Sequence, residues 1–359
     1  MTKKSGLPKN TSIDRRTFIR ASAAATAGAI AAPYYIRPAW ARGETLYINT
    51  WGGVWTESAT EAFITPFSKE TGIEVKTLSP VSFAKLKAQV TTGNYEWDVT
   101  TQGVPDCARA LRENLLEPVG KVVDPAQLSP GAINYNGIKS HALGTALTYR
   151  KDKFPNGGPQ SWADFWNIEK FPGNRSMYNN AGRVLPAALL ADGVPRDKLF
   201  PLDLDRAFKK LDEIKPHIKV WWKQGSQSEQ LIRDGEVDMI QMWNGRAENV
   251  QAQGVDVEIV WNGAEVLMVN WIVARGTPRA ELGWRYIQSA HQAERQAKFA
   301  SLMKYGPANP KAFEYIDEKL ARTLPTWPDN INVAYTPDPD WVGANMGEMV
   351  KRFNRWLAS

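Results

Sequence analysis

Segments with strand and helix patterns alternate along the first part of this 359-residue chain, and their order limits the folds that it can adopt. Residues 45–51, 73–78 and 98–101 are rich in β-forming side chains, and segments with helical spacing of apolar residues separate them. A strand–helix–strand order is typical of parallel strands whose connecting helices cover the sheet. We therefore expect an α/β fold with mixed, mainly parallel sheets, in a chain long enough to build two cores.

Two later segments indicate that the chain passes between two domains. Residues 125–137 are rich in Pro, Gly and Asn, and they precede a strand pattern at 145–149 that we expect to cross into a second domain. A strand at 266–274 is expected to cross back. This arrangement assigns residues 42–143 and 270–310 to lobe I, 144–269 to lobe II, and 311–359 to C-terminal helices that pack on the lobes.

The amino terminus has the order of an export signal. Arg15 and Arg16 precede the apolar pair Phe18-Ile19, and a weakly apolar, Ala-rich stretch follows at 21–32. Residues 38–41, Pro-Ala-Trp-Ala, then offer a small-residue cleavage site. We interpret residues 1–41 as a twin-arginine signal peptide, which predicts a periplasmic mature protein. A disordered basic tail is the alternative interpretation.

Charge and motif content exclude several classes of function. The chain has 44 basic and 38 acidic residues, but residues 1–41 hold seven of the bases and one acid, so the remainder is balanced. A basic surface for nucleic acid is therefore not expected. The three histidines have no metal-ligand spacing, the single Cys107 has no partner, and no nucleophile elbow or phosphate loop occurs. The residues therefore give no reason to expect a metal, a cofactor or a catalytic activity.

Residues 235–248 are the stretch around which we expect a binding site. Residues 237–243 are nearly all apolar and predict a short buried strand, and a helix pattern begins directly after Trp243. Asn244 would be a good N-cap for this helix, and Arg246 would lie in its first turn. Ligands of open α/β sheets bind at the carboxyl ends of strands, beside helix N-termini that favour anionic groups. An ordinary strand–helix corner with a core tryptophan is the alternative.

Tryptophan is abundant, with 15 in the chain, and several lie at strand ends. Trp51 and Trp243 are each followed closely by glycine, Trp51 by Gly52-Gly53, where backbone can approach a ligand. An indole at the rim of a cleft can cover a ligand through stacking or cation–π contact. For any single tryptophan core packing is the alternative, and we favour it for Trp162 and Trp166.

Several segments together resemble the periplasmic spermidine/putrescine-binding proteins of ABC importers. The resemblance runs from about residue 45 to residue 320. Each motif is weak by itself, but the order and spacing of the motifs together are specific. It implies two α/β lobes joined by a hinge, in the type II arrangement, that close on a small ligand without catalysis. The segments are 45–51, 67–75, 161–166, 235–245 and 305–310.

The resemblance also implies where the ligand lies, and the departures from it change the expected ligand. Trp51 and Trp243 match the tryptophans that sandwich a polyamine in that family, whereas Asn180, Arg183 and Asn270 stand where that family has acids. A site without those acids is a poor polyamine site. The candidate ligand-binding residues are Trp51, Gly52, Gly53, Gln102, Asn180, Arg183, Trp243, Arg246, Asn270 and Tyr305.

The leading hypothesis is a periplasmic substrate-binding protein that delivers its ligand to the permease subunits of an ABC importer. We expect a monomer whose ligand is a zwitterion or carboxylate-bearing amine such as an ω-amino acid, because Arg183 and Arg246 offer planar donors for a carboxylate. A surface ion pair is the alternative for each arginine. Alternative functions are a receptor for polyamines or quaternary amines, a periplasmic cofactor enzyme, or a structural partner of a membrane complex.

Overall fold

The structure is a computed structural model that describes residues 44–359, so the expected signal peptide lies outside the described residues. Its strands join in one sheet with the order β2-β1-β3-β9-β5-β8-β6-β7, and β4 and β10 add to β5. The strands are β1 (Thr45–Asn49), β2 (Glu74–Leu78), β3 (Val99–Gly103), β4 (Ile133–Asn134), β5 (Gly137–Arg150), β6 (Arg175–Tyr178), β7 (Ile218–Trp222), β8 (Met239–Trp243), β9 (Val257–Val273) and β10 (Gly306–Pro307).

Helices connect these strands, as the alternating sequence pattern predicts. The α-helices are α2 (Gly53–Ala59), α3 (Thr65–Thr71), α4 (Phe83–Thr92), α5 (Val104–Arg112), α6 (Trp162–Trp166), α7 (Ala181–Ala191), α8 (Leu204–Ile214), α9 (Gly225–Arg233), α10 (Asn244–Ala252), α11 (Ala280–Ala290), α12 (Ala293–Met303), α13 (Glu318–Ala321), α14 (Pro328–Ile331) and α15 (Pro339–Ala358). The π-turn η2 (Thr60–Ile64) joins α2 to α3, and short 3₁₀ turns are η3 (Pro125–Gln127), η4 (Lys151–Lys153), η5 (Arg196–Lys198), η6 (Lys215–His217) and η7 (Pro310–Tyr315). None of the helices in the described part is long and apolar enough to cross a bilayer.

The sheet has two halves, each with its own parallel strands. In the first half β1 pairs in parallel with β2 and β3, and in the second half β6 pairs in parallel with β7 and β8. Antiparallel pairing of β9 with β3 and of β5 with β8 attaches each half to a central pair of strands. The expected mixed α/β fold is therefore confirmed. Its strands are not mainly parallel, because the long central strands β5 and β9 pair antiparallel with each other and with the strands of both halves.

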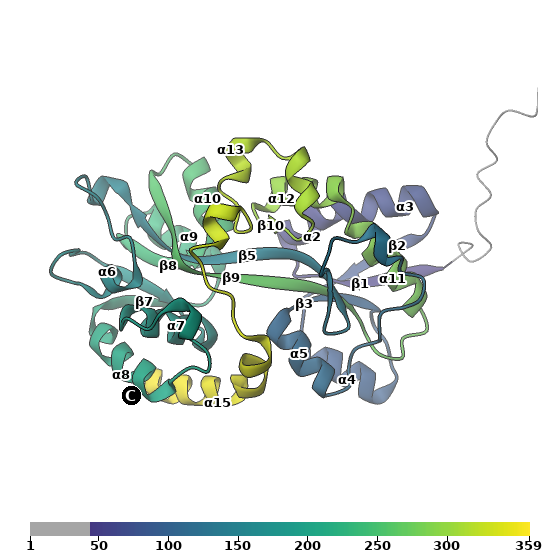
Figure 1. Ribbon diagram of the computed structural model, residues 1–359, viewed down its shortest axis with the longest axis horizontal. Coiled ribbons are helices and arrows are strands. Elements are labelled where there is room, and N and C mark those ends of the chain that lie inside the picture. Colours follow the sequence, from purple (N-terminus) through teal and green to yellow (C-terminus); the bar gives the residue numbers. More distant parts are fainter. Residues whose placement is uncertain (1–43) are drawn as a thin grey trace, which may run out of the picture. The chain divides into compact units, whose positions relative to one another are not determined.

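The central pair, β5 and β9, is much longer than the sequence pattern indicates. The sequence predicts a strand at 145–149 and another at 266–274. Instead β5 has 14 residues and β9 has 17, and they pair from Gly137 to Arg150 through two irregularities of register (Figure 1). Gly263 takes a positive φ of 71° within β9, and the strand bends there without ending.

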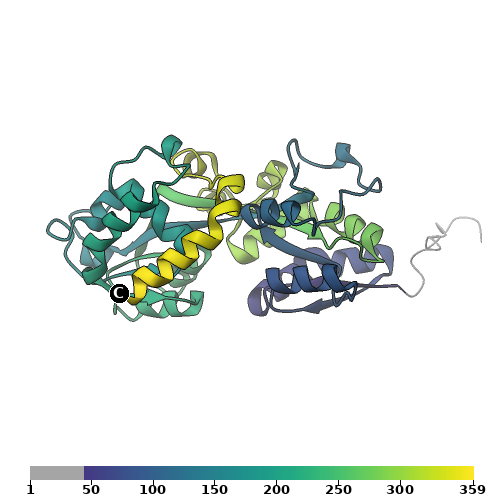
Figure 2. The same cartoon turned by 90° about the horizontal axis from the view of Figure 1, so that it is seen from below.

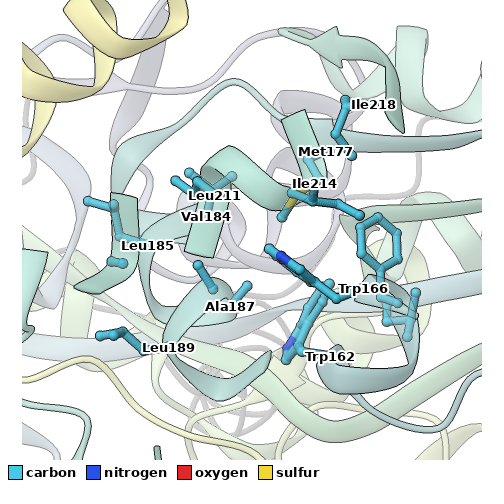
Figure 3. Close-up of a cluster of buried hydrophobic side chains, with 14 of the residues drawn as sticks. Trp162, Trp166, Met177, Val184, Leu185, Ala187, Leu189, Leu211, Ile214 and Ile218 are labelled. Carbon is cyan, nitrogen blue, oxygen red and sulfur yellow. The ribbon is translucent and has the colours of Figure 1, made fainter. Parts of the chain in front are cut away.

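Helices α6, α7 and α8 build the core of the second half. Their apolar faces meet the side chains of β6 and β7, and Figure 3 shows Trp162, Trp166, Val184 and Leu211 gathered around Met177. These side chains are at most 8% exposed. The sequence interpretation of Trp162 and Trp166 as core residues agrees with this packing.

The C-terminal helix α15 touches both halves of the sheet (Figure 2). Met349 and Phe353 are buried in the core of the second half, whereas the first turns pack on α5 of the first half. A Cβ at Gly343 would lie 2.6 Å from the carbonyl oxygen of Pro105, so only glycine allows this close approach. The chain reaches α15 through residues 332–338, the strap, in which Tyr335 pairs with β9 opposite Glu265.

Two helix starts lack the side-chain caps that the local sequence favours. Thr56 does not cap a helix, because α2 already begins at Gly53, and the Thr56 hydroxyl instead accepts the Gly52 N–H at 3.1 Å. Ser226 and Glu229 have the spacing of a capping box, but α9 begins at Gly225 without a side-chain cap. Glu229 instead pairs with Arg246 of α10.

Candidate ligand-binding site

Three side chains form a row across the central strands where the two halves meet. Thr145 of β5 lies directly opposite Trp243 of β8 on one side and Glu265 of β9 on the other. Directly opposed residues of a sheet point to the same face, so the three side chains share one face. We call Trp243, Thr145 and Glu265 the recognition row.

Arg183 lies over one end of the recognition row. It is in the first turn of α7, and its Nη1 donates to Glu265 Oε1 at 2.5 Å. The pair is enclosed, because the side chains of Arg183 and Glu265 are 17% and 2% exposed. Arg183 Nε is buried and has no hydrogen-bond partner among the described residues, so the guanidinium keeps an unused donor. A planar guanidinium with free donors is suited to a carboxylate.

Glu265 is held in an unusual electrostatic environment. Burial raises the pKa of its carboxyl to about 7, although the charge of Arg183 and hydrogen bonds from Thr145 and Arg183 act in the opposite direction. The Thr145 hydroxyl donates to Glu265 Oε2 at 3.3 Å. The carboxyl therefore changes its protonation state near neutral pH.

Aromatic side chains cover the other end of the row. Tyr178, at the end of β6, stacks on Trp222 at 4.1 Å between ring centroids, and both rings meet the Trp243 ring edge-on at 5.5 Å. Burial raises the pKa of Tyr178, whereas Arg183 and Asn180 oppose that rise. Asn180, the N-cap position of α7, thus lies near the Tyr178 hydroxyl. Three of the predicted residues, Asn180, Arg183 and Trp243, therefore lie around Tyr178.

Arg246 lies beside Trp243 and is engaged by another helix. Its Nη1 donates to Glu229 Oε1 of α9 at 2.8 Å, and its side chain is 37% exposed. A Cβ at Gly225 would lie within 3 Å of both Arg246 Nε and the Trp243 ring, which shows how closely α9 begins against them. The alternative that the sequence left open for Arg246, an ion pair, is the one observed.

The first half contributes the segment between β1 and α2. Trp51 is 51% exposed, and its indole N–H donates to the Thr101 hydroxyl of β3 at 2.9 Å. Gly52 and Gly53 both have positive φ values, 86° and 51°, which residues other than glycine adopt with difficulty. The turn therefore holds an exposed indole in a defined place.

Asn244 has a structural task that differs from the expected one. The expectation that it caps α10 is wrong, because Trp243 occupies the N-cap position. Its fully buried amide instead accepts the Gly144 N–H at 2.9 Å and donates to the Lys304 carbonyl at 2.6 Å. It thereby joins β5, α10 and the residue before Tyr305.

Tyr305 lies against the start of α10 and stacks on His141 of β5, with ring centroids 5.3 Å apart and planes inclined by 8°. Burial raises the pKa of Tyr305, and the nearby charge of Arg246 opposes that rise. Burial lowers the pKa of His141 to about 3, so this imidazole is neutral. Tyr305 thus lies near enough to Arg246 for the charge of the arginine to act on it.

Gln102 and Asn270 lie away from the recognition row. They oppose each other on β3 and β9, and residue 270 alternates with residue 265 to the opposite face of β9. Asn270 is fully buried, and its amide donates to Asn134 of β4. The structure therefore does not bring these two predicted residues together with Arg183.

Sequence reasoning missed two acids near Arg183. Glu265 is the only acid within an apolar run from Ala264 to Ile272, a signal that would have marked it. Asp106 lies in the first turn of α5, in the first half; burial raises its pKa, and the charges of Arg109 and Arg183 oppose that rise. The charge of Arg183 therefore acts on the pKa of two acids, Glu265 of β9 and Asp106 of α5.

Two surface hollows of the described part lie elsewhere. One of about 1140 Å³ lies between α7, the bend of β9 at Gly263 and the strap, and one of about 390 Å³ lies beside α11. None of the ten predicted ligand residues lines either of them. No cluster of metal-ligating side chains occurs among the described residues.

Relatives of known type match two thirds or more of the chain. Residues 62–328 match the family model of bacterial extracellular solute-binding proteins. A γ-aminobutyric acid-binding protein of Pseudomonas aeruginosa is 34% identical over 89% of this chain and 93% of its own length. A spermidine/putrescine-binding periplasmic protein of Haemophilus influenzae is 27% identical over 68% of this chain and 69% of its own.

Solved structures agree. An ABC transporter substrate-binding protein from Bradyrhizobium japonicum is 35% identical, with a TM-score of 0.81, and the match covers 87% of this chain and 99% of that one. The structure of a γ-aminobutyric acid (GABA) receptor is 34% identical, with a TM-score of 0.82, and the match covers 88% and 98% of the two chains. The expected relationship is confirmed: this chain belongs to the family of bacterial extracellular solute-binding proteins.

Proposed function

We propose that this protein is a periplasmic receptor for ω-amino acids, with GABA as its ligand, and that it delivers this ligand to the permease of an ABC importer. The observation that carries the proposal is the enclosed Arg183, whose guanidinium has an unused donor beside an aromatic wall. Such a receptor binds and releases its ligand without catalysis. Lobe I (42–143 and 270–310) and lobe II (144–269) would close on the ligand by bending of β5 and β9.

The chemistry of the site fits both ends of an ω-amino acid. In our proposal, the ligand carboxylate pairs with Arg183, and its methylene chain lies against Trp243 and Tyr178. Asp106 of α5 provides negative charge for the ammonium group from the other half of the sheet. A relative that is 34% identical and is named for GABA binding supports this assignment.

Calorimetric titration with four small molecules tests the proposal. We expect GABA to bind, and butyrate and butylamine, which each lack one charged end, to bind at least roughly a hundredfold more weakly, because a site built for a charged group rejects an analogue without it. Putrescine has the chain length of GABA but two ammonium ends. If putrescine binds more tightly than GABA, the ligand assignment is wrong.

A polyamine is the second candidate ligand, and the acids Glu265 and Asp106 favour it. Glu265 is already neutralised by Arg183, which leaves Asp106 as the acid for two ammonium groups. A buried cation beside a dication is unfavourable. We therefore rank the polyamine below the ω-amino acid.

Export by the twin-arginine route is a separate prediction. Lysine at both Arg15 and Arg16 should retain the full-length chain in the cytoplasm, whereas the unchanged protein should appear in the periplasm as a chain beginning near Arg42. Cell fractionation followed by intact-mass measurement checks both forms. Arg20→Lys, which changes an arginine outside the pair, is the matched control and should leave export unchanged. Normal export of the double variant would contradict the prediction.

A further inference from the structure

The two side chains of the Arg183–Glu265 pair differ in how fully their polar atoms are hydrogen-bonded. Both oxygens of Glu265 are engaged, Oε1 by Arg183 and Oε2 by Thr145, whereas Arg183 uses Nη1 alone and leaves Nε buried without a partner. The carboxylate thus fixes one corner of the guanidinium and leaves the Nε donor without a partner. A fixed guanidinium loses less freedom when it binds a carboxylate than a mobile one does.

The groups that face Glu265 determine how its charge responds to a ligand. Arg183 approaches from α7, Tyr335 from the strap and Tyr178 from β6, while neutral Thr145 lies beside it on β5. Burial and the charge of Glu265 raise the pKa of Tyr335 well above its ordinary value, so Tyr335 is neutral. Asp106 of α5 acts on the pair from the first half, through Arg183.

We propose that Glu265 is a positioning residue for ligand capture, which orients Arg183 in the empty receptor and takes up a proton when a ligand carboxylate shares that arginine. The inference rests on the proposed function, since it requires a ligand with a carboxylate. Arg183 is the one cation that directly pairs with Glu265 among the described residues. A second carboxylate on this guanidinium brings like charge close to Glu265 and displaces water, and both effects favour its neutral form.

The starting protonation state makes this response measurable at neutral pH. Because burial holds the pKa of Glu265 at about 7 in the empty protein, a further rise causes proton uptake between about pH 7 and pH 8.5. Both charges of GABA are constant in this range, since carboxyl and amine groups ionise near pH 4 and pH 10. Affinity should therefore increase as the pH falls, by roughly fivefold to tenfold from pH 8.5 to pH 6 for a pKa rise of about one unit.

Calorimetry in two buffers counts the protons directly. GABA is titrated into the purified protein at pH 7.5 in phosphate and in Tris, whose ionisation enthalpies differ, and the difference in heat gives the protons bound per GABA. We expect uptake of a substantial fraction of one proton. Glu265→Gln should abolish this uptake and make the affinity independent of pH, and Glu265→Asp should restore part of both.

Matched controls and outcomes separate the two proposals. Glu258→Gln changes another carboxylate on β9, outside the recognition row, and should leave the proton count unchanged. GABA binding without proton uptake, or uptake that persists in Glu265→Gln, overturns this inference and leaves the proposed function intact. Failure of GABA to bind overturns both. If Glu265→Gln does not fold, the proton count and pH dependence of the unchanged protein decide the question.

Discussion

Alanine at position 183 is expected to weaken GABA binding by about 2–5 kcal/mol, because a ligand carboxylate would lose its buried cation. This range corresponds to roughly a thirtyfold to several-thousandfold rise in Kd. The variant also leaves Glu265 buried without its ion-pair partner, so the pKa of Glu265 should rise further and the carboxyl should be neutral at pH 7. Titration calorimetry at pH 7 measures the loss.

Arg246→Ala is the matched control for Arg183→Ala. Arg246 is more than a third exposed and pairs with Glu229, so its removal should change the Kd of GABA by less than about tenfold. Arg183→Lys keeps the charge but not the planar donors, and it should fall between wild type and Arg183→Ala. Equal affinities of Arg183→Ala and the unchanged protein would show that the carboxylate binds elsewhere.

Asn244→Leu is expected to have the largest effect on stability. The substitution leaves two buried backbone groups without partners, the Gly144 N–H and the Lys304 carbonyl. Each unsatisfied buried group costs about 1–3 kcal/mol, so the free energy of unfolding should fall by roughly 2–6 kcal/mol. Urea denaturation followed by circular dichroism measures this change.

A control on the same helix tests whether the effect belongs to the buried amide. Asn249 is exposed on α10 and donates to Glu229 at 3.3 Å, so Asn249→Leu should cost less than about 1 kcal/mol. Asn244→Asp can still accept from Gly144 but cannot donate to Lys304, and it should be destabilised as well. Unchanged stability in Asn244→Leu would mean that water or a shifted backbone replaces both bonds.

The fold class and the family could be predicted because they depend on patterns that are local in sequence. Strand segments of five residues, such as Thr45–Asn49, alternate with amphipathic helices, and this order is enough to indicate an α/β sheet. The length of β9 could not be predicted in the same way. Gly263 locally favours a turn, whereas pairing with β5 keeps the strand continuous on both sides of it.

Part of the candidate site was also predictable. Asn180, Arg183 and Trp243 end strands or begin helices, and the carboxyl ends of neighbouring strands meet. Asn270 shows the limit of this reasoning, because a shift of one residue along a strand moves a side chain to the other face. The partner of Arg183 is 82 residues away in sequence, and only the tertiary fold brings Glu265 to it.

The packing of α15 across both halves makes the protein suited to thiol labelling. The chain has one cysteine, Cys107, and it is fully buried, so an introduced cysteine would be the sole reactive thiol on the described surface. Ala344 is exposed on α15, next to the close approach of Gly343 to α5. A solvent-sensitive fluorophore on Ala344→Cys would therefore sit where the two halves touch and report capture optically without contacting the ligand.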